Sequence, residues 1–469
     1  MRLTPPSTWL RLAALLLAGL LAACAHRETA EPPLLAGTAD RYEQAFVTFY
    51  PLYEMARLRH VALEDRGNPR RHELHAFNHL RRLIDHTGRN VTAPNNDTLY
   101  SSARLDLRLG PVLIEMPAMA GRYYSLQFMN FHSDNVAILG RRNAGDGPMT
   151  VAVVGPGWNG AVPAHTQRVD SDTQDMWLLV RTLVDGPADL PAVARLQDAM
   201  RIVAPQPAQA YPRQRSAPSA KPQPAEFLDV VNEFLGRNPP LGPMQRAAER
   251  DRPLGIEPGR SDAWAALPAS VQQGWTQAWA AAWATLMRPE TLRDRVIQGW
   301  EYPPAAVGQW GDELLLRATV ALRGIAALDL AETLYLSTYV DARGEALEGS
   351  QRFRIRIPKG GLPVKGFWSL TLYEGLPDGR FFLVDNPLRR YSIGNRSQGL
   401  AVAADGSIEI LVQADPPGDP RDLPNWLPAP RGPFRLTLRC YLPDPSLVRG
   451  EAELPRVERL PDARLPAAR

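Results

Sequence analysis

The stretch Phe434-Arg-Leu-Thr-Leu-Arg-Cys-Tyr441 alternates apolar and polar side chains. Successive side chains of a β-strand point to opposite faces, so the apolar residues at alternate positions from Phe434 to Cys440 share one face. We expect this face to lie in a core, where Cys440 would be a buried and unreactive thiol. The stretch therefore predicts a sheet with one packed face and one polar face.

The chain before this stretch holds further segments of the same kind. Residues 353–357 alternate Phe or Ile with Arg, and residues 367–374 form another strand pattern. Asp405-Gly406, just before the apolar residues 408–412, is a strong signal for a hairpin turn. Because turns are frequent and no helical pattern intervenes, residues 331–460 are expected to form an antiparallel β-sandwich or jelly roll.

Short apolar segments also fill the N-terminal half, between turns rich in Gly, Pro and Asp. They are residues 112–116, 123–131, 149–154 and 176–184. Residues 42–58 precede them with the spacing of a helix. Residues 41–203 are therefore expected to form a β-rich domain with a leading helix. Two domains are also expected because 469 residues exceed what one core usually serves.

Between the two β-rich regions the composition changes twice. Residues 204–225 are rich in Pro, Ala and Gln and predict an exposed, mobile linker. Residues 226–330 have helical patterns, in which Trp275, Trp279 and Trp283 are spaced as a core stripe rather than as a ladder for a ligand. The expected fold is α+β and mostly β, with two antiparallel β-sandwich or jelly-roll-like domains joined by a helical section.

The first residues have the three parts of a secretory signal peptide. Arg2 and Arg11 carry positive charge, an uncharged apolar run follows, and Leu21-Ala-Ala-Cys24 resembles a bacterial lipobox. The run is shorter than the roughly 20 residues that span a membrane. We expect residues 1–23 to be removed, Cys24 to be acylated and residues 24–40 to form a flexible tether. Ala25 favours the outer membrane, so we expect a lipid-anchored protein of the cell envelope that faces the periplasm.

Charge and motif patterns argue against several classes of function. The 53 basic and 50 acidic residues are interspersed, which does not predict nucleic-acid binding. Gly155-Pro-Gly-Trp-Asn-Gly160 has the spacing of a dinucleotide loop, but no helical pattern follows it, so we interpret it as a turn. Ser133-Asp-Asn135 lacks the lysine motifs that accompany it in penicillin-recognising enzymes.

All eight histidines lie before residue 166. His72, His75 and His79 would share one face of a helix, which suits a divalent metal, although a solvated or hydrogen-bonded helix face is the other interpretation. His72-Glu-Leu-His75 is one residue short of the zincin motif. No cofactor is predicted apart from this candidate metal.

Two sets of motifs resemble known domains. The first set is His79-Leu-Arg81, Pro94-Asn-Asn-Asp-Thr-Leu-Tyr-Ser101, Leu105-Asp106, Arg122-Tyr-Tyr124 and Arg181-Thr-Leu-Val-Asp-Gly186. It resembles the bacterial domain of unknown function 1254. The second set is Gly366-Phe-Trp-Ser-Leu-Thr-Leu-Tyr373, Asp385-Asn-Pro-Leu-Arg-Arg-Tyr-Ser392, Asn425-Trp-Leu-Pro-Ala-Pro430, Pro433-Phe434 and Arg439-Cys-Tyr441. It resembles domain 1214, which usually follows the first. The resemblance implies two β-rich domains joined by helices and brings no agreed activity.

The motifs combine aromatic rings with planar hydrogen-bonding groups, which suit a sugar or another ring-bearing ligand. The ligand-binding candidates are Asn95, Asn96, Tyr100, Arg122, Tyr123, Gln127, Trp368, Tyr373, Arg390, Tyr391, Asn425 and Trp426. The alternative for this set is packing between the two domains. In the turn of residues 95–97, bonding of the side chains to the backbone is the structural explanation.

Three functions remain in competition. The first is a non-catalytic envelope lipoprotein that binds a small molecule, a glycan or a partner, because no nucleophile, metal set or cofactor loop is recognisable. The second is a hydrolase or lyase in which His79, Asp97, Asp106 or His132 acts as an acid, a base or a metal ligand. The third is an assembly component that forms a homo-oligomer through its β domains. We favour the first.

Overall fold

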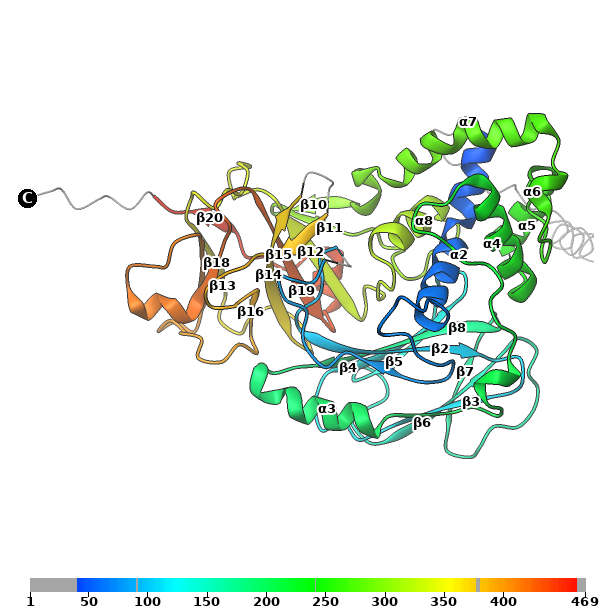
Figure 1. Cartoon of the computed structure of the whole chain (residues 1–469). Coiled ribbons are helices and arrows are strands. Elements are labelled where there is room, and N and C mark those ends of the chain that lie inside the picture. The colour runs from blue at the N-terminus through cyan, green and yellow to red at the C-terminus, as the bar shows by residue number, and fades with distance from the viewer. Residues whose placement is uncertain (1–39, 90–91, 241, 377–379, 462–469) are drawn as a thin grey trace, which may run out of the picture.

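The structure is a computed structural model that describes residues 40–89, 92–240, 242–376 and 380–461 (Figure 1). The expected signal peptide, Cys24 and the expected tether up to residue 39 lie outside the described residues. Among the described residues no helix has both the length and the apolar character needed to cross a bilayer.

The N-terminal domain is a sandwich of two sheets within the described residues (Figure 1). One sheet contains, in spatial order and all antiparallel, β1 (Asn78–His79), β2 (Thr98–Asp106), β8 (Asp175–Leu183), β4 (Tyr124–Asn130) and β5 (Asn135–Gly140). The other contains β7 (Gln167–Asp170), β6 (Met149–Val154), β3 (Val112–Met116) and β9 (Arg201–Val203), with β6 and β7 parallel. Alternate apolar residues such as Leu126, Phe128 and Ile114 meet between the sheets as a core.

The C-terminal domain is a second sandwich. Its first sheet contains β10 (Arg295–Ile297), β11 (Trp300–Tyr302), β12 (Thr333–Thr338), β19 (Phe434–Tyr441), β14 (Trp368–Gly375) and β15 (Phe381–Leu383), with β16 (Ser392–Gly394) also paired to β14. Its second sheet contains β18 (Trp426–Pro428), β17 (Ile408–Gln413), β13 (Phe353–Ile357) and β20 (Val457–Arg459). Leu436, Leu438 and Cys440 lie in the core between these sheets, so the predicted apolar face of this strand and its buried thiol are confirmed.

A layer of helices covers the outer face of the sheet that holds β2, β8 and β4 (Figure 1). The helices of this layer are α2 (Arg41–Leu63), α4 (Pro224–Arg237), α5 (Gly242–Asp251), α6 (Ala263–Ala266), α7 (Ala269–Leu286) and α8 (Leu314–Arg323). The side chain of Asp40 caps α2 by accepting a hydrogen bond from the Tyr42 amide. Met129 and Leu179 of the sheet join the helical core, so the helices belong to the N-terminal domain's packing as well as connecting the two sandwiches.

Two further α-helices of the described residues lie outside this layer: α3 (Leu190–Ala199), beside the β1 edge, and α9 (Pro445–Arg449). Within the predicted helical section, α6 and α7 are separated at Leu267-Pro268, because proline has no amide hydrogen and disfavours a helical residue before it. The tryptophan stripe packs as core: Trp275 is buried, and Trp279 and Trp283 pack against the same apolar cluster.

The Pro-rich stretch 204–225 runs along the helical layer, with many of its side chains exposed, and is hydrogen-bonded to that layer. The amides of Arg215 and Ser216 donate to the Glu233 carboxylate at 2.7 and 2.8 Å, and Trp279 Nε1 donates to the Pro222 carbonyl at 3.1 Å. A stretch without an apolar period can still be fixed when its backbone is hydrogen-bonded by side chains of neighbouring helices.

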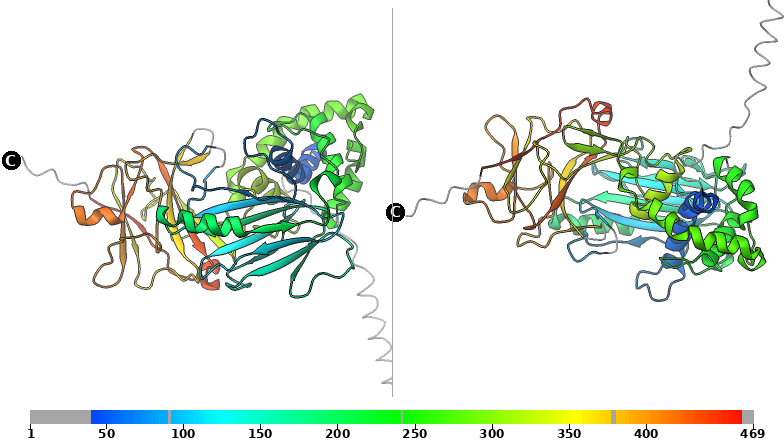
Figure 2. Two further views of the ribbon diagram at one scale, coloured as in Figure 1. Left: turned by 60° about the horizontal axis from the view of Figure 1, so that its bottom comes forward. Right: turned by 90° about the horizontal axis from the view of Figure 1, so that it is seen from above.

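The two sandwiches meet side by side, with the helical layer over the first (Figure 2). A small apolar cluster joins Tyr123 and Leu183 of the N-terminal domain to Phe367, Tyr441 and Leu442 of the C-terminal domain. The rings of Phe367 and Tyr441 stack with their centroids 3.9 Å apart. The predicted α+β, β-rich fold with several antiparallel sheets is confirmed.

Candidate functional site

One end of the β2–β8–β4 sheet faces the β12–β19–β14 sheet across a layer of polar side chains. Strand alternation explains the layer: Leu436 and Leu438 turn into the C-terminal core, so Arg439 and Tyr441 turn toward the N-terminal domain. We call this layer the interdomain cluster. Its members are Asn95, Asp97, Tyr100, Tyr123, Gln127, Arg181, Glu332, Tyr335, Ser369, Tyr373, Arg439 and Tyr441.

Arg439 lies at the centre of the interdomain cluster and is only 2% exposed. Its Nη1 donates to Thr371 Oγ1 at 2.7 Å, and its Nη2 donates to the hydroxyl of Tyr373 at 2.5 Å and to the Ala93 carbonyl at 3.2 Å. Its Nε has no hydrogen-bond partner among the described residues. A buried guanidinium thus keeps one donor unused.

Asp97 is the buried carboxylate of the cluster that opposes the charge of Arg439. Its Oδ2 accepts hydrogen bonds from Ser369 Oγ at 2.7 Å and from the Tyr441 hydroxyl at 3.2 Å. Asn95 donates to the same Tyr441 hydroxyl at 2.6 Å, and its own Oδ1 accepts from the Asp97 amide at 2.6 Å. Burial raises the pKa of Asp97, and the charge of Arg439 opposes this rise.

Arg181 supplies the second buried guanidinium. Its Nη1 donates to Gln127 Oε1 and its Nη2 to the Ala326 carbonyl, each at 2.7 Å. Its guanidinium carbon lies 5.4 Å from the centre of the Tyr100 ring, which is within range of a cation–π contact. Gln127 also donates to the Ala327 carbonyl at 2.9 Å, so this group fixes the segment that leads from the helices into the C-terminal sandwich.

Glu332 balances a third arginine at the edge of the cluster. Its carboxylate accepts from the Tyr123 hydroxyl and from Arg142 Nε, both at 2.9 Å. Burial raises the pKa of Glu332, and the bond and charge of Arg142 oppose the rise. Counting Arg142 at its edge, the described cluster sets three arginines against two carboxylates, Asp97 and Glu332, and therefore carries excess positive charge.

The interdomain cluster reaches solvent through Tyr335. This side chain on β12 is 36% exposed. The Arg439 guanidinium carbon lies 5.0 Å from the Tyr335 ring centre, and the Tyr335 and Tyr441 rings meet edge to face at 6.3 Å. Tyr100 is partly exposed as well. A molecule approaching Tyr335 would meet its ring beside the Arg439 guanidinium.

The structure brings together six of the candidates chosen from sequence: Asn95, Asp97, Tyr100, Tyr123, Gln127 and Tyr373. Most of their bonds cross between the domains; Tyr373, for example, donates to the Pro94 carbonyl at 2.7 Å. Packing between domains, the alternative kept open for this set, therefore accounts for much of their chemistry. Packing between the domains does not explain why the Tyr335 ring is exposed or why Arg439 Nε has no hydrogen-bond partner among the described residues.

The other ligand candidates lie elsewhere. Trp368 is in the core of the C-terminal sandwich. Arg390, Asn425 and Trp426 bond to loop and strand carbonyls of the same domain. Asn96 donates to the Ile84 carbonyl at 2.5 Å, Arg122 pairs with Asp189, and the Tyr391 hydroxyl lies 2.9 Å from His86 Nδ1.

The predicted histidine face is wrong, because residues 64–77 form turns and loop and His79 lies in β1. His79 Nδ1 lies 2.7 Å from Ser101 Oγ, and the His75 ring lies 4.7 Å from that of Tyr211. In the described part of the chain no group of three or more His, Cys, Asp or Glu side chains is placed to hold a metal ion.

The four catalytic candidates do not converge either. Asp97 and Asp106 lie at opposite ends of β2, on the order of 30 Å apart at the rise of an extended strand. His132 follows β4, is buried, and has its pKa lowered to about 3 by burial and by the charge of Arg317. His79 belongs to the edge strand.

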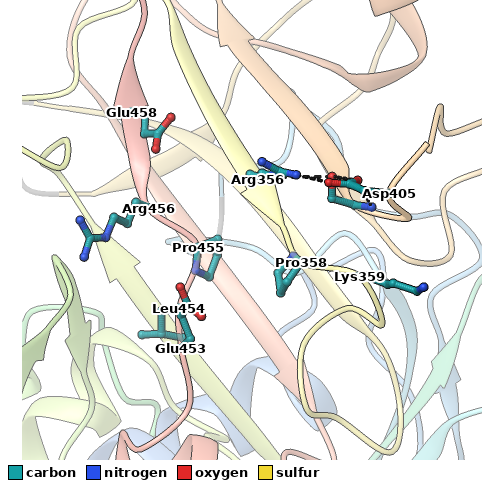
Figure 3. Close-up of a pocket in the computed structure, with 10 residues that line it drawn as sticks. Arg356, Pro358, Lys359, Asp405, Glu453, Leu454, Pro455, Arg456 and Glu458 are labelled. Carbon is teal, nitrogen blue, oxygen red and sulfur yellow. Dashed lines mark hydrogen bonds and ion pairs between the residues drawn. The ribbon is translucent and has the colours of Figure 1, made fainter. Parts of the chain in front are cut away.

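A hollow of about 340 Å³ lies on the C-terminal sandwich (Figure 3). Arg356, Lys359 and Arg456 line it together with the same number of acidic residues, Asp405, Glu453 and Glu458. Arg356 already pairs with Asp405 across its upper part. These charged side chains are balanced and mostly exposed, and the buried Ser407 of the lining is already hydrogen-bonded to Asp405 and Arg356, so the hollow is a solvated, self-paired surface.

Sequence reasoning did not select Arg181, Glu332, Tyr335, Ser369, Arg439 and Tyr441. The signal was present for two of them, since Arg181 and Arg439 stand within strands on the face opposite the apolar residues. A charged residue there usually faces water. In this protein a second domain covers that face instead. Strand periodicity cannot predict such a tertiary contact.

Comparison with known proteins identifies two domains. Residues 74–204 match the model described as "Protein of unknown function (DUF1254)", and residues 332–445 match "Protein of unknown function (DUF1214)". No similar sequence was found among the curated proteins.

Two solved structures are similar. The VPA0106 protein from Vibrio parahaemolyticus is 22% identical with a TM-score of 0.69, and the match covers 90% of this chain and 99% of that one. An uncharacterized protein from Burkholderia cenocepacia is 18% identical with a TM-score of 0.39, over 89% of this chain and 88% of that one. The first of these supports the fold alone. With both domain matches in the expected order, the chain belongs to the proteins in which DUF1254 is followed by DUF1214.

Proposed function

We propose that this chain is a lipid-anchored envelope protein that binds a small anionic, ring-bearing molecule at the interdomain cluster. The observation that carries the binding proposal is Arg439, a buried guanidinium with an unused donor next to the exposed ring of Tyr335. The anchoring proposal rests on the signal-like residues 1–23 and the lipobox that ends at Cys24.

The excess positive charge of the interdomain cluster favours a negatively charged ligand. Burying a cation without full compensation is costly. Asp97 opposes the charge of Arg439, whereas Arg181 acts on Glu332, which Arg142 already pairs. A carboxylate of the ligand would compensate the excess charge, and arginine binds planar carboxylates with a defined geometry. The phenol rings of Tyr335 and Tyr100 supply apolar faces against which a ring can stack.

The chemistry of the cluster favours binding over catalysis. A hydroxyl nucleophile needs a base that accepts its proton and a group that orients the base. Ser369 donates directly to Asp97, and the described cluster contains no histidine. The catalytic alternative would have to use this one carboxylate, whose Oδ2 already accepts hydrogen bonds from both Ser369 and Tyr441.

The binding proposal is tested by calorimetry on the chain without residues 1–23, titrated with a panel of cyclic and aromatic carboxylates and their neutral amides. We expect binding of carboxylates only, and Tyr335→Ala should weaken it roughly fivefold to tenfold, the value of one aromatic contact. Trp158→Ala is the matched control, since Trp158 is 37% exposed in a turn of the other domain. If no carboxylate binds, or if both variants bind it alike, this proposal is wrong.

The anchoring proposal has its own test. The full chain and Cys24→Ser are expressed in a bacterial host, and lysates are separated into membrane and soluble fractions. We expect the full chain in the outer-membrane fraction and the variant outside the lipid-anchored pool, because the acylated thiol is lost. Equal membrane association of both chains would show that acylation of Cys24 does not anchor the protein.

A further inference from the structure

A second group of buried charges lies at the opposite end of β2 and β8 from the interdomain cluster. Asp106 ends β2, Asp175 begins β8, and the two are paired across the sheet. Arg59 reaches them from the last turns of α2 and Arg237 from the last turn of α4, so the helical layer and the sheet are joined here by ion pairs (Figure 1).

The two carboxylates are already crowded with donors. Arg237 binds Asp175 through Nη2 at 2.7 Å and Nε at 2.9 Å, and Asn238 donates to the same carboxylate at 3.0 Å. Arg108 Nε lies 2.8 Å from Asp106. Arg59 Nε is left at 3.3 Å from Asp175, and Arg59 Nη1 has no hydrogen-bond partner in the part of the chain that the structure describes.

A fourth arginine adds positive charge without a carboxylate of its own. Arg104 on β2 is buried, and its guanidinium lies 4.0 Å from the Trp177 ring centre. Its Nε and Nη1 have no hydrogen-bond partner among the described residues. Burial and then the charge of Arg59 lower the pKa of Arg104 to about 9, so the two arginines repel each other. Arg59, Arg108 and Arg237 therefore share two aspartates, and Arg104 adds a fourth arginine charge beside them.

This excess charge forms the floor of a hollow of about 130 Å³ that opens on the surface. Arg59, which is 2% exposed, lies at its floor, and the ring of His72 lines it with an unpartnered Nε2. Arg71 and Arg213 stand at its rim and are balanced there by Glu64 and Glu73. Glu64 also acts on Arg59. The hollow and the buried charges next to it together contain six arginines (59, 71, 104, 108, 213 and 237) and four carboxylates (64, 73, 106 and 175), so positive charge remains in excess.

We propose that this hollow binds one small oxyanion, a phosphate or carboxylate group, through Arg59 at its floor and Arg71 and Arg213 at its rim. An oxyanion would give Arg59 the hydrogen bond that it lacks and would compensate the positive charge that the two aspartates leave over. Liquid water takes about 30 Å³ per molecule, so the hollow has room for roughly four waters or for one phosphate or carboxylate group. A larger ligand would have to extend outward between the rim arginines.

The test is isothermal calorimetry on the mature full chain with inorganic phosphate or acetate, against chloride at equal ionic strength. Acetate alone binding would identify a carboxylate site, and phosphate alone a site for a tetrahedral oxyanion. We expect Arg59→Gln to weaken binding roughly tenfold or more, the loss of one charge-assisted hydrogen bond. The double variant Arg71→Gln, Arg213→Gln changes exposed side chains only, so it tests the site even if Arg59→Gln fails to fold.

Arg195→Gln is the control, because Arg195 is exposed on α3 at the other side of the domain. If Arg195→Gln still binds the oxyanion and the double variant Arg71→Gln, Arg213→Gln does not, the proposed site is supported. No binding beyond that of chloride, or equal binding by the rim variant and the control, would overturn it. The site is independent of the interdomain cluster, so Tyr335→Ala should leave oxyanion affinity unchanged whatever it does to a ring-bearing ligand.

Discussion

His132 makes the stability of this protein depend on pH in a defined direction. The residue follows β4 and is 5% exposed, and Arg317 Nη1 donates to its carbonyl at 3.2 Å. A proton on its ring would be buried beside the Arg317 charge. Burial and that charge lower the pKa of His132 to about 3, against about 6.5 in an unfolded chain.

The sign follows from proton uptake. Below pH 6.5 the unfolded chain binds a proton at His132 that the folded chain does not bind until about pH 3. The free energy of unfolding therefore falls as the pH falls through 6.5 and stops falling on this account near pH 3. Between pH 7 and pH 5 the loss is about 2 kcal/mol for this one residue.

The assay is urea unfolding followed by tryptophan fluorescence at pH 7 and pH 5, for the natural chain and for His132→Gln. The variant should lose about 2 kcal/mol less between the two pH values, because it has no imidazole to protonate in the unfolded state. His165→Gln, which removes an exposed histidine, is the matched control variant. If His132→Gln and the natural chain lose the same free energy, the ring is not held neutral by the fold and the reasoning is refuted.

Three further perturbations test the packing. Arg439→Met should destabilise the protein by about 2–4 kcal/mol in urea unfolding, because it leaves Thr371, Tyr373 and the Ala93 carbonyl without their donor; a loss below 1 kcal/mol would contradict a tight interdomain cluster. Trp275→Ala should cost about 3–5 kcal/mol in the same assay, since the ring is buried and its Nε1 donates to the Leu254 carbonyl, while Trp158→Ala should cost under about 0.5. In the chain without residues 1–24, the Cys440 thiol should react with a thiol reagent only after unfolding, because burial raises its pKa and excludes the reagent; rapid labelling of the folded chain would show that this face of β19 is open.

The strands that sequence patterns located are those with one apolar face in a core. The expected segments 112–116, 353–357 and 149–154 coincide with β3, β13 and β6. β2 was not predicted as a strand, although it is among the longest. The residues Tyr100, Arg104 and Asp106 point away from the core between the two sheets. Tyr100 and Asp106 contact arginines, and Arg104 contacts Trp177, so this face of β2 lacks the apolar pattern of a strand with one face in a core.

The histidine segment failed for a related reason. Spacing at i, i+3 and i+7 is typical of a helix face, but residues 64–77 are held by turn bonds, such as Asn68 Nδ2 to the Val61 carbonyl at 2.7 Å. Asn68, Pro69 and the left-handed backbone of His75 at φ 61 oppose a continuous helix. Local breakers outweighed the periodicity of three side chains.

The candidate site was also predicted only in part. The motif around Asn95 and Asp97 was selected because its residue types suit recognition, and the structure turns those groups toward Tyr441, Ser369 and Arg439 of the other domain. Partners separated by more than 270 positions leave no trace in local spacing. The sequence motifs therefore indicated the residues that the N-terminal domain contributes to the cluster. Their partners in the C-terminal domain became visible only in the structure.

The two domains are therefore better regarded as one functional unit than as two modules on a linker. Separated, the C-terminal sandwich would expose the stacked rings of Phe367 and Tyr441 to water, and Asp97 would lose both donors to its carboxylate. Arg439 alone would keep its bonds to Thr371 and Tyr373 but would lose the Ala93 carbonyl. A ligand that adds a carboxylate between Arg181 and Arg439 would bind both halves at once, so its binding should raise the cooperativity of unfolding of the two sandwiches together.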